Sequence, residues 1–237
     1  MNQFYKFRLT TGYLAHLYKS VIRQDHSHLK PIISRYLPRN GVAIDVGAHG
    51  GQITRLLAGI APDGFVVAVE PSGYTRSILR AALWLRRCTN TIVFAAALGA
   101  TCGTMLIRTP LKRRGDMGYG LANLVDGGAH SISEPVALVT LDSLAAQLGL
   151  TRVDFIKADI EGFEAELIRG AHHVLKTFRP AVYLEMNDEF LRRAGSSRAT
   201  LWAELLGLGF NPHDAAGANP RPLAAAASAE DVLWLPA

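Results

Sequence analysis

The stretch AIDVGAHGGQIT, residues 43–54, joins a hydrophobic run to a segment with helical character. The run VAIDV is predicted to form a buried strand, with Asp45 near its carboxyl end. Three glycines follow it: Gly47, Gly50 and Gly51. Glycines permit a tight turn whose backbone approaches a ligand closely, and ligands of open parallel sheets bind at the carboxyl ends of the strands. The turn is therefore predicted to line a ligand site.

Two common nucleotide-binding turns do not fit this stretch. The NAD fingerprint G-x-G-x-x-G requires glycine at the positions of His49 and Gln52. A phosphate-binding P-loop requires a Lys-Ser or Lys-Thr pair after the glycines, and none follows here. The remaining pattern, D-x-G-x-H-x-G, resembles the first motif of methyltransferases that use S-adenosyl-L-methionine.

A carboxylate follows the next predicted strand. The run FVVAVE, residues 65–70, ends in Glu70, about 25 residues after Asp45, a separation typical of an acid that binds a ribose. A carboxylate there can accept hydrogen bonds from both ribose hydroxyls. The alternative is structural, because glycine turns follow buried strands in many α/β proteins and an acid at this point can cap the next helix.

Short apolar runs alternate with helical segments along most of the chain. The predicted strands are residues 42–46, 65–70, 91–98, 153–160 and 181–186, and the predicted helices are residues 51–59, 72–87, 161–176 and 188–208. Such alternation indicates parallel strands with crossover helices on both faces. The predicted class is α/β, doubly wound.

Two regions depart from this alternation. Residues 103–110 and 134–141 are predicted strands that flank a glycine-rich, charged segment, residues 111–134, where no crossover helix is evident. Long segments of this kind in compact domains are often lids or binding loops. Near the carboxyl terminus, VLWLP, residues 232–236, is predicted to add a strand at the edge of the sheet.

Length and composition favour one domain. The chain has 237 residues, 49% of them hydrophobic, and no linker or repeat divides it. We expect residues 1–40 to form a helical extension and residues 41–237 the main domain. The net charge of +5 comes from scattered cations, so no nucleic-acid partner is expected. Two cysteines without metal-ligand spacing and the lack of a signal-peptide core favour the cytoplasm.

The N-terminal segment is predicted to be an amphipathic helix. Its apolar residues recur at helical spacing: Tyr13, Leu14, Leu17, Val21 and Ile22. We expect this helix to pack on the domain or cover its site. The alternative is contact with a membrane surface, to which Lys19 and Arg23 would contribute. No apolar run approaches the roughly 18 residues of a membrane span, so stable insertion is not expected.

A second motif identifies a family. Five stretches of the chain together resemble the FkbM family of methyltransferases. They are IDVGAHGG, VAVEPS, AAALGA, LVTLDSL and VDFIKADIEGFEAELIRGAHHVL, the last of which covers residues 153–175. The resemblance runs from about residue 41 to residue 185, and KADIEGFE is its most specific element. It implies the class I methyltransferase fold, a three-layer sandwich with a seven-stranded, mostly parallel sheet. It also implies methyl transfer from S-adenosyl-L-methionine to a hydroxyl of a sugar, polyketide or related small molecule.

The resemblance also implies a set of cofactor-binding residues. Those that would line the methionine part are Asp45, Gly47, Ala48, His49 and Gly51. Glu70 would hold the ribose, and Ala97 and Leu98 would flank the adenine. His49 stands where the family commonly has an amide, and an imidazole can donate similar hydrogen bonds.

Carboxylates near the end of the fourth and fifth predicted strands are the catalytic candidates. A hydroxyl must lose its proton when it is methylated, so a base within hydrogen-bond reach helps. Asp159 is the first choice for base or acceptor-orienting residue, with Glu161 and Glu185 completing an acidic cluster. Helix capping is the structural alternative for Asp159, Glu161 and Glu164. Several carboxylates could also hold Mg²⁺ or Ca²⁺, but the spacing fixes no ligand set, so no metal is predicted.

The acceptor itself is not specified by the sequence. Tyr119 and Asn123, within residues 111–134, are candidate contacts to a hydroxylated acceptor. Two other functions stay open: a non-catalytic module that binds adenosylmethionine, and a methyltransferase that acts on nucleic acid. The sequence does not indicate an oligomeric state.

Overall fold

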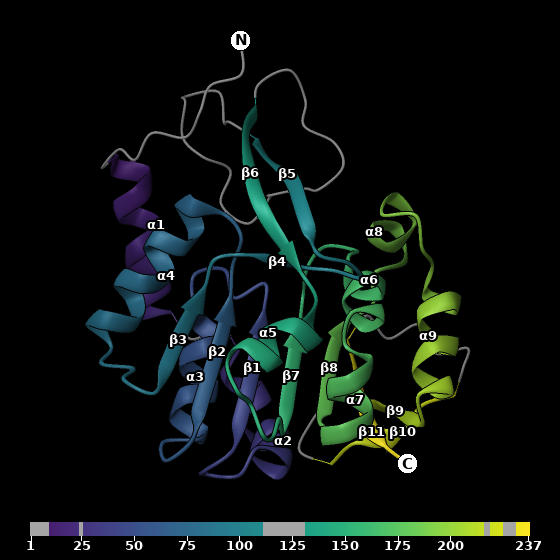
Figure 1. The fold of residues 1–237 in the computed structure, drawn as a ribbon. Helices are drawn as coiled ribbons and strands as arrows, with labels where there is room; N and C mark the ends of the chain where they lie inside the picture. The colour runs from purple at the N-terminus through teal and green to yellow at the C-terminus, as the bar shows by residue number, and fades with distance from the viewer. Residues whose placement is uncertain (1–9, 24–25, 111–130, 216–218, 225–230) are drawn as a thin grey trace.

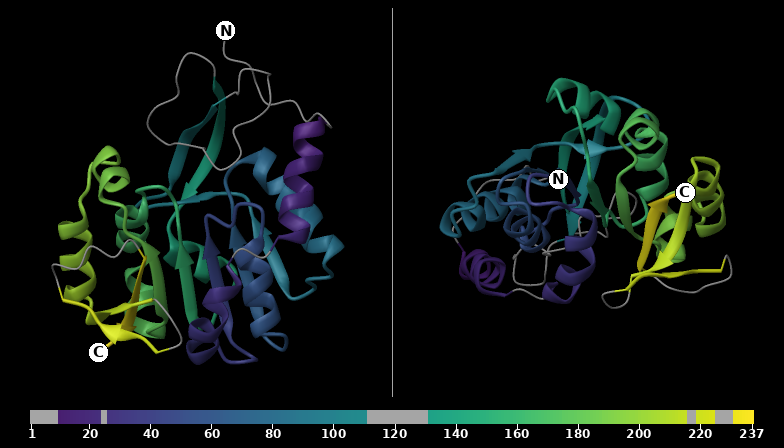
Figure 2. Two further views of the ribbon diagram at one scale, coloured as in Figure 1. Left: turned by 180° about the vertical axis from the view of Figure 1, so that it is seen from behind. Right: turned by 90° about the horizontal axis from the view of Figure 1, so that it is seen from below.

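The computed structural model describes residues 10–23, 26–110, 131–215, 219–224 and 231–237. They form a three-layer α/β structure, with a central sheet between two layers of helices and a second, smaller sheet beyond one edge (Figures 1 and 2). The central sheet has eight strands in the order β10-β9-β11-β8-β7-β1-β2-β3, and the small sheet has the order β4-β6-β5. The predicted α/β, doubly wound class is confirmed.

Five central strands are parallel: β3 (Thr91–Phe94), β2 (Phe65–Val69), β1 (Val42–Val46), β7 (Phe155–Ala158) and β8 (Ala181–Glu185). In the middle of the sheet Ala43 pairs with Val66 on one side and with Phe155 on the other. Because all five strands run the same way, their carboxyl ends meet at one edge. Asp45, Glu70, Asp159 and Glu185 lie at or near that edge.

Three antiparallel strands complete the sheet: β11 (Asp231–Pro236), β9 (Phe210–Asp214) and β10 (Arg221–Pro222). The resemblance implied seven strands, and the two-residue β10 makes eight. The prediction that residues 232–236 join the sheet edge is wrong, because β11 lies between β8 and β9. Residues 231–234 of β11 pair with β8 and residues 232–236 pair with β9, so the backbone hydrogen bonds of this strand are used on both sides.

Alternate residues of the strands face two helical layers. Ile44 and Val46 face α5 (Leu141–Gln147), α6 (Glu164–Arg169), α7 (His172–Phe178) and α9 (Arg198–Gly207). Ala43 faces η1 (Ser27–Leu29), α2 (Lys30–Tyr36) and α3 (Gln52–Ile60), while Ala68 contacts α4 (Gly73–Leu85). Burial on both faces explains why these strands read as continuous apolar runs.

Two predicted helices are interrupted. The helix expected over residues 161–176 is divided into α6 and α7 at Gly170, where a Cβ would lie 2.0 Å from the carbonyl oxygen of Gly99. The helix expected over residues 188–208 is divided into α8 (Asp188–Arg193) and α9. Gly195, with a φ of 81°, ends the first piece, and Ser197 caps the second.

The predicted N-terminal helix forms α1 (Thr11–Ile22) and packs along α4 (Figures 1 and 2). Thr10 caps it by accepting a hydrogen bond from the Tyr13 amide. His16 Nδ1 lies 2.8 Å from the Tyr74 hydroxyl, and the rings of Tyr13 and Tyr74 meet edge to face. None of the helices in the described ranges has the length and apolar character needed to cross a bilayer.

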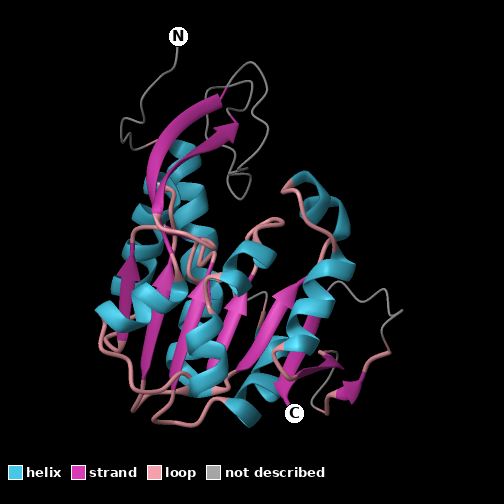
Figure 3. Cartoon of the chain, turned by 45° about the vertical axis from the view of Figure 1, so that its right-hand side comes forward, coloured by secondary structure: helices cyan, strands magenta, loops and turns pink. Residues whose placement is uncertain are grey.

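The small sheet stands beyond the carboxyl edge of the parallel strands (Figure 3). Its long strands, β5 (Gly103–Pro110) and β6 (Ser131–Val139), pair antiparallel, and β4 (Ala97–Leu98) pairs with the end of β6. The predicted strand over residues 91–98 is therefore shared between two sheets, as β3 and β4. Residues 111–130, with the acceptor candidates Tyr119 and Asn123, lie outside the described residues.

Candidate active site

A pocket of about 320 Å³ lies at the carboxyl edge of β1, β2 and β7. Four segments line it: the turn after β1, the end of β2, residues 96–98, and residues 157–163 at and after β7. His26 and Ile107 add contacts from other parts of the chain. The pocket therefore forms where parallel-sheet folds usually bind ligands.

The turn after β1 is held by backbone contacts to both neighbouring strands. The amides of Gly47 and Ala48 both donate to the carbonyl oxygen of Val69, each at 3.0 Å. Gly47 has a φ of 75°, and a Cβ there would lie 2.1 Å from the carbonyl oxygen of Asp159. This glycine therefore permits close packing between two strand ends, while Ala48 and the rest of the turn line the pocket.

Two of the predicted cofactor residues lie behind the pocket wall. Asp45 is fully buried and accepts a hydrogen bond from the Thr54 hydroxyl at 2.6 Å. Burial raises the pKa of Asp45, and the Lys157 ammonium opposes that rise. Gly51, with a φ of 82°, begins α3, and a Cβ there would lie 2.6 Å from Leu79 Cδ1. Both residues hold the turn in place without lining the pocket.

Glu70 lies in the pocket wall at the end of β2. Its Oε2 accepts the amide of His49 at 3.0 Å, and its Oε1 accepts the amide of Ser72 at 2.9 Å. Burial raises the pKa of Glu70 to about 7, although both hydrogen bonds favour the ionised form. Each carboxylate oxygen has a second lone pair, so two ligand hydroxyls could also donate here.

The wall near Glu70 continues as an apolar surface. Ala97 and Leu98, predicted to flank an adenine, line the pocket from β4, and Ala96 precedes them. Ile107 joins them from β5 and is buried. Sequence reasoning missed Ile107, because its contact depends on the way the small sheet folds back over the pocket. These side chains offer a surface suited to a flat aromatic ring.

His49 combines an unusual backbone with a neutral side chain. Its φ is 50°, a left-handed conformation that costs a non-glycine residue about 1–2 kcal/mol. The hydrogen bond from its amide to Glu70 helps to hold that conformation. Burial lowers the pKa of the His49 imidazole to about 4, so the ring that lines the pocket is neutral at pH 7.

Asp159 brings a carboxylate to the pocket, with a cation beside it. Its Oδ2 lies 3.4 Å from the ammonium of Lys157, which lowers the pKa of Asp159. Burial and the charge of Asp159 raise the pKa of Glu185 to about 8, and the two carboxyl groups share a hydrogen bond. Protonated Glu185 therefore donates to ionised Asp159. Glu185 does not line the pocket itself and reaches it only through this contact.

Glu161 and Glu164 have different surroundings, although both follow β7. Glu161 lines the pocket and has a φ of 52°, so the wall contains two left-handed non-glycine residues. Burial, with added repulsion from Asp159, raises the pKa of Glu161 to about 7. Glu164 is buried away from the pocket, and its Oε1 accepts the amide of Ile160 at 2.9 Å. Glu164 therefore has a structural contact to the loop after β7, although it does not cap α6, whose N-cap is Phe163; Glu161 faces the ligand space.

Lys157 is a pocket residue that sequence reasoning missed. It is buried and lies between Asp159 and Asp45, with 4.0 Å from Nζ to Asp45 Oδ1. Burial alone would lower the pKa of Lys157, but the two carboxylates outweigh it and the pKa is raised. The available signal was a lysine inside an otherwise apolar strand, since buried lysines are nearly always paired. Within the described ranges, no three histidine, cysteine or acidic side chains are placed to hold a metal ion.

Comparisons with known proteins bear on the family and the fold of this chain. Residues 45–212 match the family model of the methyltransferase FkbM domain. A methyltransferase FkbM from Methylobacillus flagellatus has a similar structure, with a TM-score of 0.55 and 14% identity over 95% of this chain and 55% of that one. A candidate O-methyltransferase from Klebsiella pneumoniae has a TM-score of 0.50 and 12% identity over 95% of this chain and 88% of that one.

Among curated proteins, AMB antimetabolite synthetase AmbE from Pseudomonas aeruginosa is 26% identical over 203 residues. That match covers 72% of this chain but only 9% of the synthetase. The family match covers most of the chain, and the class I fold places its glycine turn and acidic strand ends around one pocket. The chain therefore belongs to the FkbM family of adenosylmethionine-dependent methyltransferases.

Proposed function

We propose that this chain transfers a methyl group from S-adenosylmethionine to a hydroxyl oxygen of a small molecule or sugar. The observation that carries the proposal is a single pocket with Glu70 in one wall and with Asp159 and Glu161 in another. A carboxylate that could bind a ribose and a carboxylate that could accept a hydroxyl proton thus face the same pocket. We also propose that residues 41–237 form the methyltransferase domain and residues 1–40 an extension of it.

The pocket fits the cofactor in size and chemistry. Its volume of about 320 Å³ lies within the roughly 300–1,000 Å³ of small-molecule sites. Glu70 would hold the ribose, Ala97 and Leu98 would flank the adenine, and Ala48 and His49 would line the methionine part. Ionised Asp159 would place negative charge near a cationic sulfonium. When bound, adenosylmethionine supplies an electrophilic methyl group.

The chain's own residues would orient the acceptor and take its proton. Asp159 stays ionised beside Lys157 and would accept a hydrogen bond from the acceptor hydroxyl, which aligns the oxygen for attack. Glu161 has a pKa of about 7 and would receive the hydroxyl proton on its carboxylate near neutral pH. Glu185 would act as a positioning residue by donating to Asp159.

The test is a transfer assay on a panel of sugars and other hydroxylated small molecules. We expect formation of adenosylhomocysteine with at least one acceptor, and NMR of the product should show a methyl group on oxygen. Asp159→Asn should reduce turnover and leave adenosylhomocysteine binding largely unchanged, whereas Glu189→Gln, at an exposed surface ion pair, should change neither. A methyl group found on nitrogen or carbon would contradict the proposal, and cofactor binding without any transfer would favour a non-catalytic module.

A further inference from the structure

Exposed apolar side chains gather on two neighbouring helices, away from the pocket. Eight large hydrophobic residues are exposed in the described part of the chain, and five of them belong to α1 and α4. They are Leu14 at 56% exposure, Tyr18 at 67%, Ile22 at 57%, Trp84 at 78% and Leu85 at 49%. We call these five residues the α1–α4 surface. None of them lines the pocket.

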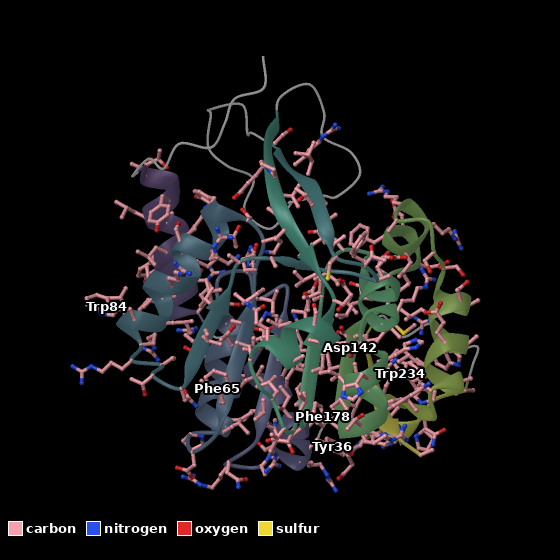
Figure 4. All side chains as sticks on the ribbon, viewed as in Figure 1. Tyr36, Phe65, Trp84, Asp142, Phe178 and Trp234 are labelled. Atoms are coloured by element: carbon pink, nitrogen blue, oxygen red, sulfur yellow. The ribbon has the colours of Figure 1, made fainter. Side chains whose placement is uncertain are left out.

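The exposed residues of α1 form a regular row. Leu14, Tyr18 and Ile22 are spaced four residues apart, so they lie along one side of the helix. Tyr13 and Ser20, on the side toward the domain, are buried. The helix therefore presents apolar side chains both to the domain and to the outside. Trp84, near the end of the adjacent α4, projects from the side of the molecule (Figure 4).

The same part of the chain has cations and no acids. Residues 11–23 and 73–87, which cover α1, α4 and the residues directly after them, contain six of the 25 lysines and arginines and none of the 20 acidic residues. Five of these cations are exposed on or directly after α1 and α4: Lys19, Arg23, Arg80, Arg86 and Arg87. The apolar side chains are thus flanked by positive charge on both helices, which is complementary to an anionic surface.

We propose that the α1–α4 surface docks on a membrane that contains anionic lipids. The apolar row of α1 and the ring of Trp84 enter the headgroup region, while the flanking cations contact lipid phosphates. A bilayer interface accepts single protruding apolar side chains without a matching groove, and the amphipathic rings of Tyr18 and Trp84 suit that boundary. Docking through these helices leaves the pocket uncovered by the membrane-binding residues.

Trp84 provides a direct readout on the unmodified chain. The other two tryptophans, Trp202 and Trp234, are buried at 6% and 0% exposure, so an environmental change on docking belongs to Trp84. We expect vesicles of phosphatidylglycerol and phosphatidylcholine to shift the fluorescence emission of Trp84 to shorter wavelength. The same vesicles should protect that fluorescence from quenching by acrylamide. Phosphatidylcholine vesicles alone should give little change. Trp84→Phe should abolish the spectral shift while the variant still sediments with the anionic vesicles.

Surface variants test the contribution of each helix. Tyr18→Ser combined with Ile22→Ser should lower the affinity for anionic vesicles, measured by sedimentation, by roughly tenfold or more. The reason is that each substitution removes apolar side-chain area that would be buried in the membrane. Arg80→Gln combined with Arg86→Gln should also weaken it, and added salt should weaken binding of the unmodified chain. Leu206→Ser, at 46% exposure on α9, is the matched control and should bind normally. Unchanged thermal unfolding should accompany each variant.

Four results would overturn the proposal. The first is the absence of any Trp84 response to anionic vesicles, and the second is equal binding to neutral vesicles. The third is vesicle binding that the α1 and α4 substitutions leave unchanged. If the chain instead forms a concentration-dependent dimer through Trp84 and does not bind vesicles, the α1–α4 surface belongs to a second copy and the membrane proposal fails.

Discussion

The ammonium of Lys157 lies 3.4 Å from Oδ2 of Asp159 and 4.0 Å from Oδ1 of Asp45. It connects the end of β7, where Asp159 faces the pocket, with β1, where Asp45 is completely buried. A buried lysine is costly to desolvate unless it is paired, and both carboxylates here act as its partners. Lys157 thus links the stability of the central strands to the charge on Asp159.

Replacing Lys157 with methionine should destabilise the protein and raise the pKa of Asp159. The substitution leaves Asp45 buried without its cation, and breaking such a pair costs about 3–5 kcal/mol. The pKa of Asp159 should also rise, because the group that lowers it is gone. Urea unfolding measures the first effect. Lys176→Met, on the exposed side of α7, is the control, and an equal loss in both variants would contradict the account.

Turnover should increase with pH through about pH 7, because Glu161 accepts a proton only when it is ionised. At saturating adenosylmethionine, where the ionisation of Glu70 does not limit the rate, kcat/KM for the acceptor should rise until the pH exceeds about 7 and then level off. Glu161→Gln should remove that dependence and reduce turnover by roughly 10²–10⁴-fold, the usual contribution of a positioned base. A variant that keeps the same pH profile would exclude Glu161 as the base.

The free energy of unfolding should fall as the pH rises from about 4.5 to about 7, partly because of Glu164. The folded protein keeps the proton of Glu164 up to about pH 7, while the unfolded chain loses it near 4.5. Over that interval the folded state binds more protons, so rising pH favours unfolding. Glu164→Gln should reduce the loss between pH 5 and pH 8 by about 1–3 kcal/mol. Glu166→Gln, at a surface ion pair on the same helix, should leave the loss unchanged in urea unfolding.

Two glycine-to-alanine substitutions should have opposite effects. Gly47→Ala places a Cβ 2.1 Å from the Asp159 carbonyl oxygen at a φ of 75°, so the strand ends must separate. We expect a loss of about 3 kcal/mol or more in urea unfolding. Gly59→Ala, in α3 with no atom within 4 Å of the added Cβ, should stabilise by about 0.5–1 kcal/mol. A mild effect at Gly47 would show that the turn is not held against β7.

Local patterns were sufficient to predict which strand ends meet around the pocket. The glycine turn, Glu70 and Asp159 each follow a buried strand, and parallel strands bring their carboxyl ends to one edge. The α1 helix was also predicted from helical spacing, but Leu14 and Ile22, expected on its apolar face, are exposed, and they align with Tyr18, which the pattern did not include. These features depend on residues near one another in the sequence, so they can be predicted without knowledge of the tertiary structure.

Features that depend on distant contacts were not predicted. Trp234 lies on an interior strand because β11 pairs with β8 on one side and with β9 on the other, and no local signal encodes those pairings. At Gly170, where α6 ends, the Gly99 backbone approaches so closely that a Cβ would lie 2.0 Å from its carbonyl oxygen. Lys157 looked like one polar residue in an apolar strand, and its role required the positions of Asp45 and Asp159.

The central claim is that the pocket beside the glycine turn binds the adenosylmethionine cofactor, with Glu70 on its ribose. Isothermal titration calorimetry of adenosylhomocysteine with the full chain tests this claim. The test variant is Glu70→Ala, which removes the carboxylate that accepts the His49 amide. The control is Glu134→Ala, which removes a carboxylate that accepts the Gly73 amide instead. We predict saturable binding that Glu70→Ala weakens at least roughly tenfold, a loss of about 1.4 kcal/mol or more, and that Glu134→Ala changes little. The absence of binding at millimolar ligand, or equal affinity in the Glu70 variant, would contradict the account.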